Sequence, residues 1–248
     1  MEINTYLDAT YLKTAQQANL SEEENEKIVV SLVEEAISNN YKLVMLRANY
    51  ITLAKKIISD ANSDVLIGAV IGFHEGTNSV NEKLSEATKA IVLGADELDF
   101  VINYEAFKKG DFEIIDQEVV EGTALCLKNK KVVKWIIEVA TLTNEEIIVI
   151  SQRIKNLVIK NFGKKNADKV FVKSSTGFFK TENDKPNGAT FESMKLIIEN
   201  AKPLKVKAAG GVRDLETAIK MIELGVDRIG TSSAKEILQN TQNKKSDY

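Results

Sequence analysis

Two lysines that each end a short apolar run are the residues in this sequence best suited to covalent chemistry. Lys173 ends the run 168–173, and Lys207 ends the run 204–207. A lysine at the end of a buried strand is costly unless chemistry or a counter-charge requires it there. Because side chains alternate along a strand, both lysines can point inward at the same edge of a sheet.

A second ammonium group is sufficient, in magnitude, to turn a lysine into a nucleophile. A free lysine, with a pKa of about 10.4, is only roughly a thousandth neutral near pH 7.4. A like charge ~4 Å away, at an effective dielectric constant of ~20, costs about 4 kcal/mol, or about three pKa units. We therefore expect one of these lysines to activate the other for attack on a carbonyl group. Solvated surface lysines are the alternative, since Lys and Arg together number 33.

Acidic and basic side chains on other predicted strands face the same interior. In the run 97–102, Asp99 lies on the face opposite Leu98 and Phe100. An acid inside an apolar strand needs a partner, which the lysines can supply, and it can also move protons through a water. Asp8, near the end of the first predicted strand, is a similar candidate.

The fifth predicted strand carries the last interior pair, Lys134 and Glu138. The two residues are spaced so that they share a face of an extended strand. They are candidates for the active site or for a structural ion pair.

Glycines and serines at the ends of two late strands predict a site for a phosphate group. Gly210 and Gly211 end the seventh predicted strand, and Gly230, Ser232 and Ser233 end the eighth and begin a helix. Glycine lets backbone N–H groups approach an anion, and serines at a helix N-terminus add donors. Gly177, after the sixth predicted strand, can contribute to the same site.

Strand-like and helix-like segments alternate along the whole chain, with no linker or break in composition. The predicted strands are 3–8, 42–47, 64–71, 97–102, 131–138, 169–174, 204–209 and 227–231. The predicted helices are 21–38, 50–61, 79–93, 111–128, 143–163, 190–201, 214–224 and 232–240. Eight such units in 248 residues predict an α/β fold, a single-domain TIM (β/α)8 barrel spanning 1–248, with an open doubly wound sheet as the alternative. No G-x-G-x-x-G motif follows the first strand, which disfavours a dinucleotide-binding sheet.

Local signals support these boundaries. Ser21 with Glu24 and Thr143 with Glu146 have the spacing of a capping box, and Asp214 can cap a helix. Gly94, Asn166 and Gly225 stand where preceding helices are expected to end, in the left-handed conformation.

Composition excludes several classes of function. A net charge of −3 gives no basic surface for nucleic acid or membrane, and no apolar run reaches the ~18 residues of a membrane span. One cysteine, Cys126, fits a buried structural thiol and a cytoplasmic protein. The one histidine, His74, excludes a three-histidine zinc site. At its strand-to-helix turn we expect a solvated side chain, with a catalytic base as the alternative.

At these residues the chain resembles the deoxyribose-phosphate aldolases, the DeoC-type class I aldolases. The resemblance covers nearly the whole length, and its motifs are 7–10, 94–99, 137–138, 172–177, 207–213 and 230–233. It implies a TIM barrel that reversibly cleaves 2-deoxy-D-ribose 5-phosphate to D-glyceraldehyde 3-phosphate and acetaldehyde, without metal or cofactor. A homodimer is the family-level expectation.

The resemblance also implies individual roles. Lys173 would form the Schiff base, Lys207 would tune it, and Asp99 would be the proton-transfer acid. The family's phosphate-binding positions match Gly210, Gly211, Ser232 and Ser233.

Some positions depart from the family's pattern. Met45, followed by Arg47, replaces the usual Cys-Asn-Pro, and His74 replaces a proline. Arg47 either adds positive charge near the mouth or is solvated. The polar segment 241–248 is expected to be a flexible tail whose last residue, Tyr248, either reaches the active site or lies in a disordered end.

Two other functions fit the same residues. One is a different imine-forming sugar-phosphate lyase or a transaldolase, which would not use acetaldehyde as the donor. The other is a barrel that binds phosphosugars without catalysis, which would form no reducible imine. A metal-dependent aldolase is disfavoured by the single histidine.

Overall fold

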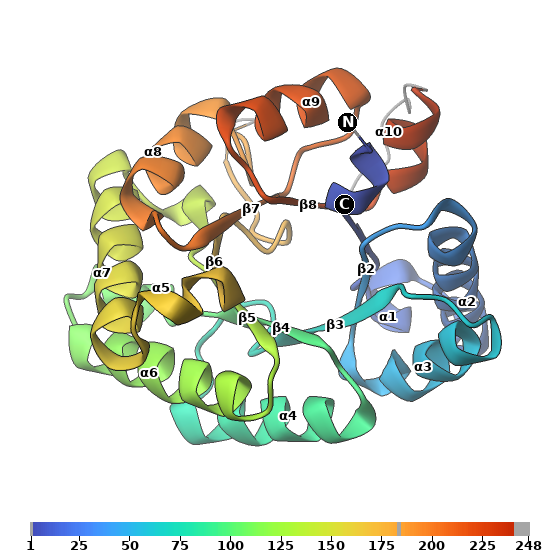
Figure 1. Ribbon diagram of the computed structural model, residues 1–248, viewed down its shortest axis with the longest axis horizontal. Coiled ribbons are helices and arrows are strands. Elements are labelled where there is room, and N and C mark those ends of the chain that lie inside the picture. Colours follow the sequence, from blue (N-terminus) through green and yellow to red (C-terminus); the bar gives the residue numbers. More distant parts are fainter. Residues whose placement is uncertain (1, 183–184, 241–248) are drawn as a thin grey trace.

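Eight parallel strands close on themselves into a barrel, and helices surround it (Figure 1). The structure is a computed structural model that describes residues 2–182 and 185–240. Each strand pairs with its neighbours in sequence, and β8 pairs with β1 to close the sheet. The strands are β1 Leu7–Thr10, β2 Leu43–Leu46, β3 Leu66–Ile71, β4 Glu97–Val101, β5 Val132–Ile136, β6 Val170–Lys173, β7 Lys205–Ala209 and β8 Arg228–Thr231. The predicted single-domain TIM barrel is thereby confirmed, and the open sheet is wrong.

The helices follow the predicted segments closely, with short additions in the loops. The α-helices are α1 Ala15–Ala18, α2 Glu22–Asn39, α3 Ile51–Asp60, α4 Val80–Leu93, α5 Tyr104–Lys108, α6 Phe112–Lys128, α7 Asn144–Phe162, α8 Phe191–Ala201, α9 Leu215–Leu224 and α10 Ala234–Gln239. The 3-10 helices are η1 Ile3–Tyr6, η2 Ala48–Tyr50, η3 Val139–Thr141 and η4 Lys164–Lys169. None of the helices in the described part of the chain combines the length and the hydropathy that a membrane span needs.

Most of the predicted helix ends are confirmed. The capping boxes that begin α2 at Ser21 and α7 at Thr143 are both formed, and Asp214 accepts the amide of Thr217 at the start of α9. Gly94 and Gly225 end α4 and α9 in the left-handed conformation. Local side chain–backbone bonds decide these ends, and for that reason the sequence predicts them well.

Three predicted boundaries are wrong. The segment 3–8 is not one strand: residues 3–6 form η1, and β1 begins only at Leu7. Within η1 the side chain of Asn4 donates to the carbonyls of Asn39 and Asn40, so this segment contacts the end of α2. Asn166 does not end a helix but lies within η4, after α7 has ended at Gly163. The fifth strand ends at Ile136 rather than at 138.

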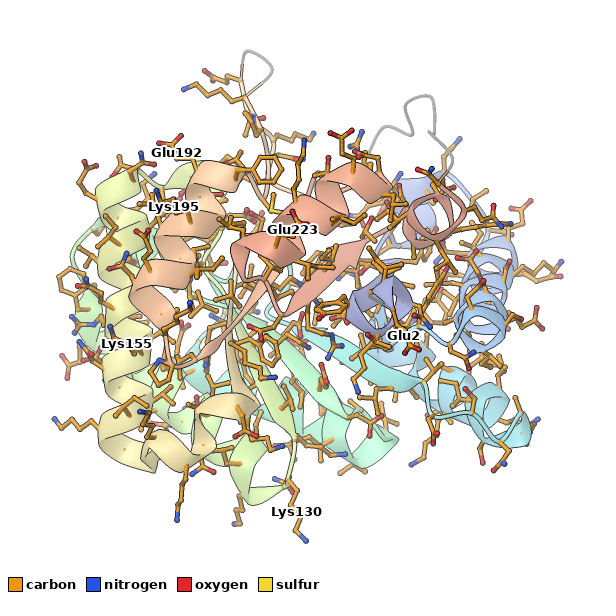
Figure 2. All side chains as sticks on the ribbon, turned by 45° about the horizontal axis from the view of Figure 1, so that its top comes forward. Glu2, Lys130, Lys155, Glu192, Lys195 and Glu223 are labelled. Carbon is orange, nitrogen blue, oxygen red and sulfur yellow. The ribbon has the colours of Figure 1, made fainter. Side chains whose placement is uncertain are left out.

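The interior of the barrel is divided into an apolar part and a charged part. Beside β2 and β3 it is filled by a small cluster of Leu12, Leu43, Met45 and Val70. Strands β4 to β8 and β1 instead turn charged side chains inward, and these are almost completely buried. Charged side chains such as Lys130, Glu192 and Lys195 lie on the outer surface (Figure 2), so the inward charges are exceptional.

The layer between barrel and helices is largely apolar, although it also holds a buried ion pair between Lys83 on α4 and Glu118 on α6. Trp135 on β5 is fully buried there, packs its ring 5.0 Å from that of Phe100 and donates from Nε1 to the hydroxyl of Thr123 on α6. Cys126 on the same helix is also buried, which confirms the structural thiol. Helix α6 approaches Trp135 closely because residue 122 is glycine.

Replacing Gly122 by valine should therefore destabilise the fold. A Cβ atom at this position would lie 2.7 Å from Cη2 of Trp135, so the indole would have to move within a filled layer. We expect a loss of about 1–3 kcal/mol in the free energy of unfolding by urea denaturation. Ala124→Val, which adds the same side chain on an exposed face of α6, is the control and should change it by less than about 0.5 kcal/mol. Equal losses in both variants would contradict this account of the packing.

Candidate active site

Asp99 on β4 stands at the centre of the buried charges. Its Oδ1 accepts from Lys134 at 2.7 Å, and its Oδ2 accepts from both Lys173 and Lys207 at 2.9 Å. The sheet register places these groups together, because Asp99 is the Cα partner of Lys134 and Lys173 is that of Lys207. The structure thus brings together the three residues that the sequence singles out first.

A second layer of charge lies below this group, toward the amino ends of the strands. Asp8 on β1 contacts Lys207 at 2.5 Å and is also bound by Arg228 on β8. Glu97 contacts Lys134 at 2.5 Å and Arg228 at 3.3 Å. Asp8 is therefore a counter-ion for Lys207, and Lys134 bridges two carboxylates.

The number of charges in this network favours one neutral amine. The direct ion pairs join three carboxylates, from Asp8, Glu97 and Asp99, to four basic groups. The network therefore carries a formal charge of +1 when every group is ionised, and a buried net charge is costly. Lys134 and Lys207 each contact two carboxylates, whereas Lys173 contacts only Asp99 among the described residues. Lys173 is thus the cation that costs least to neutralise.

The pKa of Lys173 agrees with this inference. Burial is the largest influence and, with the positive charges of Lys207 and Lys134, lowers the pKa to about 8 against the opposing attraction of Asp99. The charge of a second lysine, expected to be the main cause of such a shift, contributes less than the loss of solvent. At pH 7 about a tenth of Lys173 is then a neutral amine.

The pKa values of two carboxylates in the network, those of Asp8 and Asp99, are lowered. Burial opposes ionisation of Asp99, but Lys134, Lys173 and Lys207 outweigh it and hold its pKa well below the usual range. Arg228 and Lys207 likewise overcome burial and lower the pKa of Asp8. Asp99 is therefore a permanent negative charge beside the Lys173 amine.

A pocket at the carboxyl end of the barrel opens onto Lys173. Its lining includes Gly177, Gly210, Gly211, Gly230 and Ser232 among the predicted residues. Thr10, Thr176, Asn187 and Arg213 also line it. Ser233 does not line the pocket; it is buried behind the rim, where its amide donates to the hydroxyl of Thr231.

Two glycines in this region are required by close approach. A Cβ on Gly188 would lie 2.4 Å from the carbonyl oxygen of Gly210, so the loop before α8 packs backbone to backbone on the turn after β7. A Cβ on Gly230 would lie 2.9 Å from Cε of Lys207. Gly230 therefore makes room for the lysine.

Of the two alternatives for Lys134 and Glu138, the structural ion pair is wrong. Lys134 is paired with Asp99 and Glu97, whereas Glu138 lies beyond the end of β5 and accepts from the amide and the hydroxyl of Thr176. The prediction assumed an extended strand, in which residues 134 and 138 would share a face. Glu138 instead has a φ of 57°, so the chain has left the strand before this residue.

Aromatic residues form the side of the mouth near β2 and β3. His74 lies in the turn after β3, as expected, but its side chain is only partly exposed, because it stacks on Phe178 at 5.7 Å between ring centroids. Arg47 donates to the carbonyl of Leu12 and lies 4.9 Å from the centroid of Phe73. Arg47 is therefore not fully solvated, and the alternative that it adds positive charge near the mouth stays a prediction.

Several residues of the site were missed by sequence reasoning. Glu97 shares a strand face with Asp99, and period-two alternation applied one step further would have found it. Arg228 stands alone at the start of β8, and Thr176 and Gly188 lie in loops without a local signal. Tyr248 lies outside the described residues. No group of three or more His, Cys, Asp or Glu side chains in the described ranges is arranged to hold a metal ion.

The fold and this site define an enzyme of the (β/α)8-barrel class with a buried amine facing its pocket. The chain belongs to the DeoC/LacD family of aldolases, since the model of that family matches residues 11–240. It is therefore an aldolase, a carbon–carbon lyase.

Individual relatives agree over the full length. A deoxyribose-phosphate aldolase from Thermococcus gammatolerans is 36% identical over 98% of this chain and 98% of its own. One from Staphylococcus saprophyticus is 37% identical over 100% of both chains. A tetrameric deoxyribose phosphate aldolase from Aeropyrum pernix is similar in structure, with a TM-score of 0.77 and 27% identity over 96% of this chain and 89% of that one.

The reactivity of Lys173 should follow a pKa of about 8. The amine must lose its proton before it reacts, so its rate of acetylation by trace acetic anhydride should rise about tenfold per pH unit below pH 8 and level off above it. Peptide mass spectrometry between pH 6 and 10 measures this rate, with the exposed lysines of the same sample as internal reference. A rate that keeps rising to pH 10 would contradict the assignment.

Proposed function

We propose that this chain is a class I aldolase that reversibly cleaves 2-deoxy-D-ribose 5-phosphate to D-glyceraldehyde 3-phosphate and acetaldehyde. The observation that carries the proposal is the Lys173 amine, which faces the pocket with a pKa of about 8. The names of the full-length relatives support the substrate.

In the proposed reaction the Lys173 amine attacks the aldehyde carbon of the open-chain sugar, and loss of water gives an imine. The hydroxyl on the third carbon then loses its proton, the bond between the second and third carbons breaks, and the imine accepts the electron pair as an enamine. Protonation of the enamine and hydrolysis release acetaldehyde and restore the lysine. The reaction needs no cofactor.

Asp99 and Lys207 are the groups proposed to move these protons. The Lys207 amine donates to the carboxylate of Asp99 at 2.9 Å. Asp99 also accepts from the Lys173 nitrogen at 2.9 Å. Because Asp99 is held ionised, it is proposed to pass protons on through a water rather than to retain them, with Lys207 as the second group on this path. Asp8 and Lys134 are proposed as counter-ions that fix these two groups.

The glycine-lined side of the pocket is proposed to bind the phosphate. Gly177, Gly210, Gly211 and Gly230 bring the backbone close to it, and Ser232 adds a hydroxyl. Arg213 is exposed at the same pocket and supplies a positive charge. Ser233 would act only from behind, by shaping the turn. Phosphate binding here would orient the reacting carbon toward Lys173.

Assembly remains a prediction. The homodimer expected from the family stands beside a tetrameric relative, the aldolase from Aeropyrum pernix. Sedimentation velocity of the full chain distinguishes a dimer from a tetramer directly.

Borohydride trapping with acetaldehyde tests the proposed function. We expect an ethyl adduct on Lys173 by peptide mass spectrometry, no adduct in Lys173→Leu, and cleavage of deoxyribose 5-phosphate only by the unchanged protein. An adduct on Lys207 or Lys134 would support the imine mechanism but would show that Lys173 is not the nucleophile. Trapping with a different donor, but not with acetaldehyde, would favour another imine-forming lyase. A protein that binds the sugar phosphate and traps nothing would favour the non-catalytic barrel.

Asp99→Asn should separate imine formation from turnover. Asp99 raises the pKa of Lys173, so its loss should lower that pKa below 8 and move the trapping profile toward acid. Turnover should fall by about 10²–10⁴-fold, because the carboxylate proposed to pass the protons is lost. Asp96→Asn, the same change at the opposite end of the barrel, is the control. A trapping profile that moves toward alkali would contradict the assigned electrostatics.

A further inference from the structure

Glu138 is a buried carboxylate that the charge network does not use. It is 1% exposed and lies two residues beyond the end of β5, with a φ of 57°. A left-handed conformation at a residue other than glycine costs on the order of 1–3 kcal/mol, and a buried carboxylate needs compensating hydrogen bonds. Backbone preference does not explain why residue 138 is a glutamate. The contacts of its side chain must therefore offset these costs.

The carboxylate binds one residue twice. Its Oε2 accepts from the amide of Thr176 at 3.1 Å and from the hydroxyl of Thr176. The same hydroxyl oxygen accepts from the amide of Phe178 at 3.0 Å. Oε1 has no hydrogen-bond partner within the described part of the chain, and burial raises the pKa of Glu138 to about 7 against the bonds from Thr176.

The segment held in this way is one rim of the pocket. Thr176, Gly177 and Phe178 all line it. From the other side Asn187 donates to the carbonyl of Gly177 at 3.3 Å. Glu138 is therefore the only contact from the β5 side, among the hydrogen bonds of the described residues, that fixes the backbone of this rim.

The nucleophile is held by other means. Lys173 lies at the end of β6, and its amine is bound by Asp99. Its carbonyl accepts from the amide of Ile137 at 3.0 Å, a ladder bond that does not involve the Glu138 side chain. Loss of that side chain should thus leave the amine in place while it releases the rim.

We propose that Glu138 is a positioning residue: by binding Thr176 through both its amide and its hydroxyl, it fixes the 176–178 rim against which the phosphorylated part of the substrate binds. This inference rests on the proposed function. It assigns Glu138 to recognition of the sugar phosphate and not to the chemistry of the imine.

The test compares Glu138→Ala with Glu138→Gln. The alanine variant loses both bonds, so KM for deoxyribose 5-phosphate should rise by about tenfold or more, while trapping of acetaldehyde on Lys173 stays within about twofold. Glutamine keeps an amide oxygen that can accept both bonds, so its KM should return to within about threefold of the unchanged protein. Thr176→Val, which loses the hydroxyl and with it the bonds to Glu138 and to the amide of Phe178, should also raise KM.

Asp227→Ala is the matched control. Its carboxylate accepts the amide of Val206 at 2.9 Å at the opposite end of the barrel, so it also loses a carboxylate–amide bond but leaves the rim intact. Its KM should not change. An unchanged KM in Glu138→Ala would overturn the proposal, as would trapping that falls in proportion to cleavage or a glutamine variant as impaired as alanine.

Hydrogen exchange separates this proposal from the proposed function. The amides of Thr176 and Phe178 should exchange at least about tenfold faster in Glu138→Ala, whatever the reaction is. If the unchanged protein traps no imine and cleaves no sugar phosphate, the proposed function fails, and the exchange rates alone decide whether Glu138 holds the rim. Unchanged exchange at both amides would overturn that role.

Discussion

The carboxylate of Asp99, shared by three lysines, is the interaction on which the interior of this barrel depends. Taking each ion out of water costs several kcal/mol, so four cations and three carboxylates can be buried only in mutual contact. The parallel register helps to satisfy this condition, because it makes Asp99 the Cα partner of Lys134, and Lys207 the partner of both Lys173 and Arg228. Packing follows the same requirement: residue 230 is glycine, which leaves space for the stem of Lys207.

Unequal pairing within that network singles out Lys173. Lys134 and Lys207 each lie between two carboxylates, and burial of Lys134 is outweighed by Asp99 and Glu97, which raise its pKa. Lys173 shares a single oxygen of Asp99 and faces the pocket. One stable arrangement of charges thus provides both a firmly ionised support and an amine that gives up its proton near neutral pH.

The pocket is built by a different kind of contact. Strand register holds the amine, whereas the rim consists of loop backbone that is fixed by single side chains and by close glycine contacts. Gly188 and Gly210 pack backbone to backbone, and Asn187 and Glu138 bind the 176–178 rim from its two sides. Recognition and chemistry can therefore vary independently within this fold, as is typical of barrels whose sites lie on βα loops.

The sequence by itself determined the barrel, most helix ends and the group of Lys173, Lys207 and Asp99. These features depend on local caps and on period-two alternation, which a single chain displays directly. Only the tertiary structure decided which residues are partners. In it Lys134 pairs with Glu97 instead of Glu138, and Arg228 joins the charge network. Ser233 lies behind the rim, and His74 stacks on Phe178. It also made burial the larger influence on Lys173. Distances between residues far apart in the chain, and the loss of water around them, arise only when the strands close into a barrel, and no local pattern encodes them.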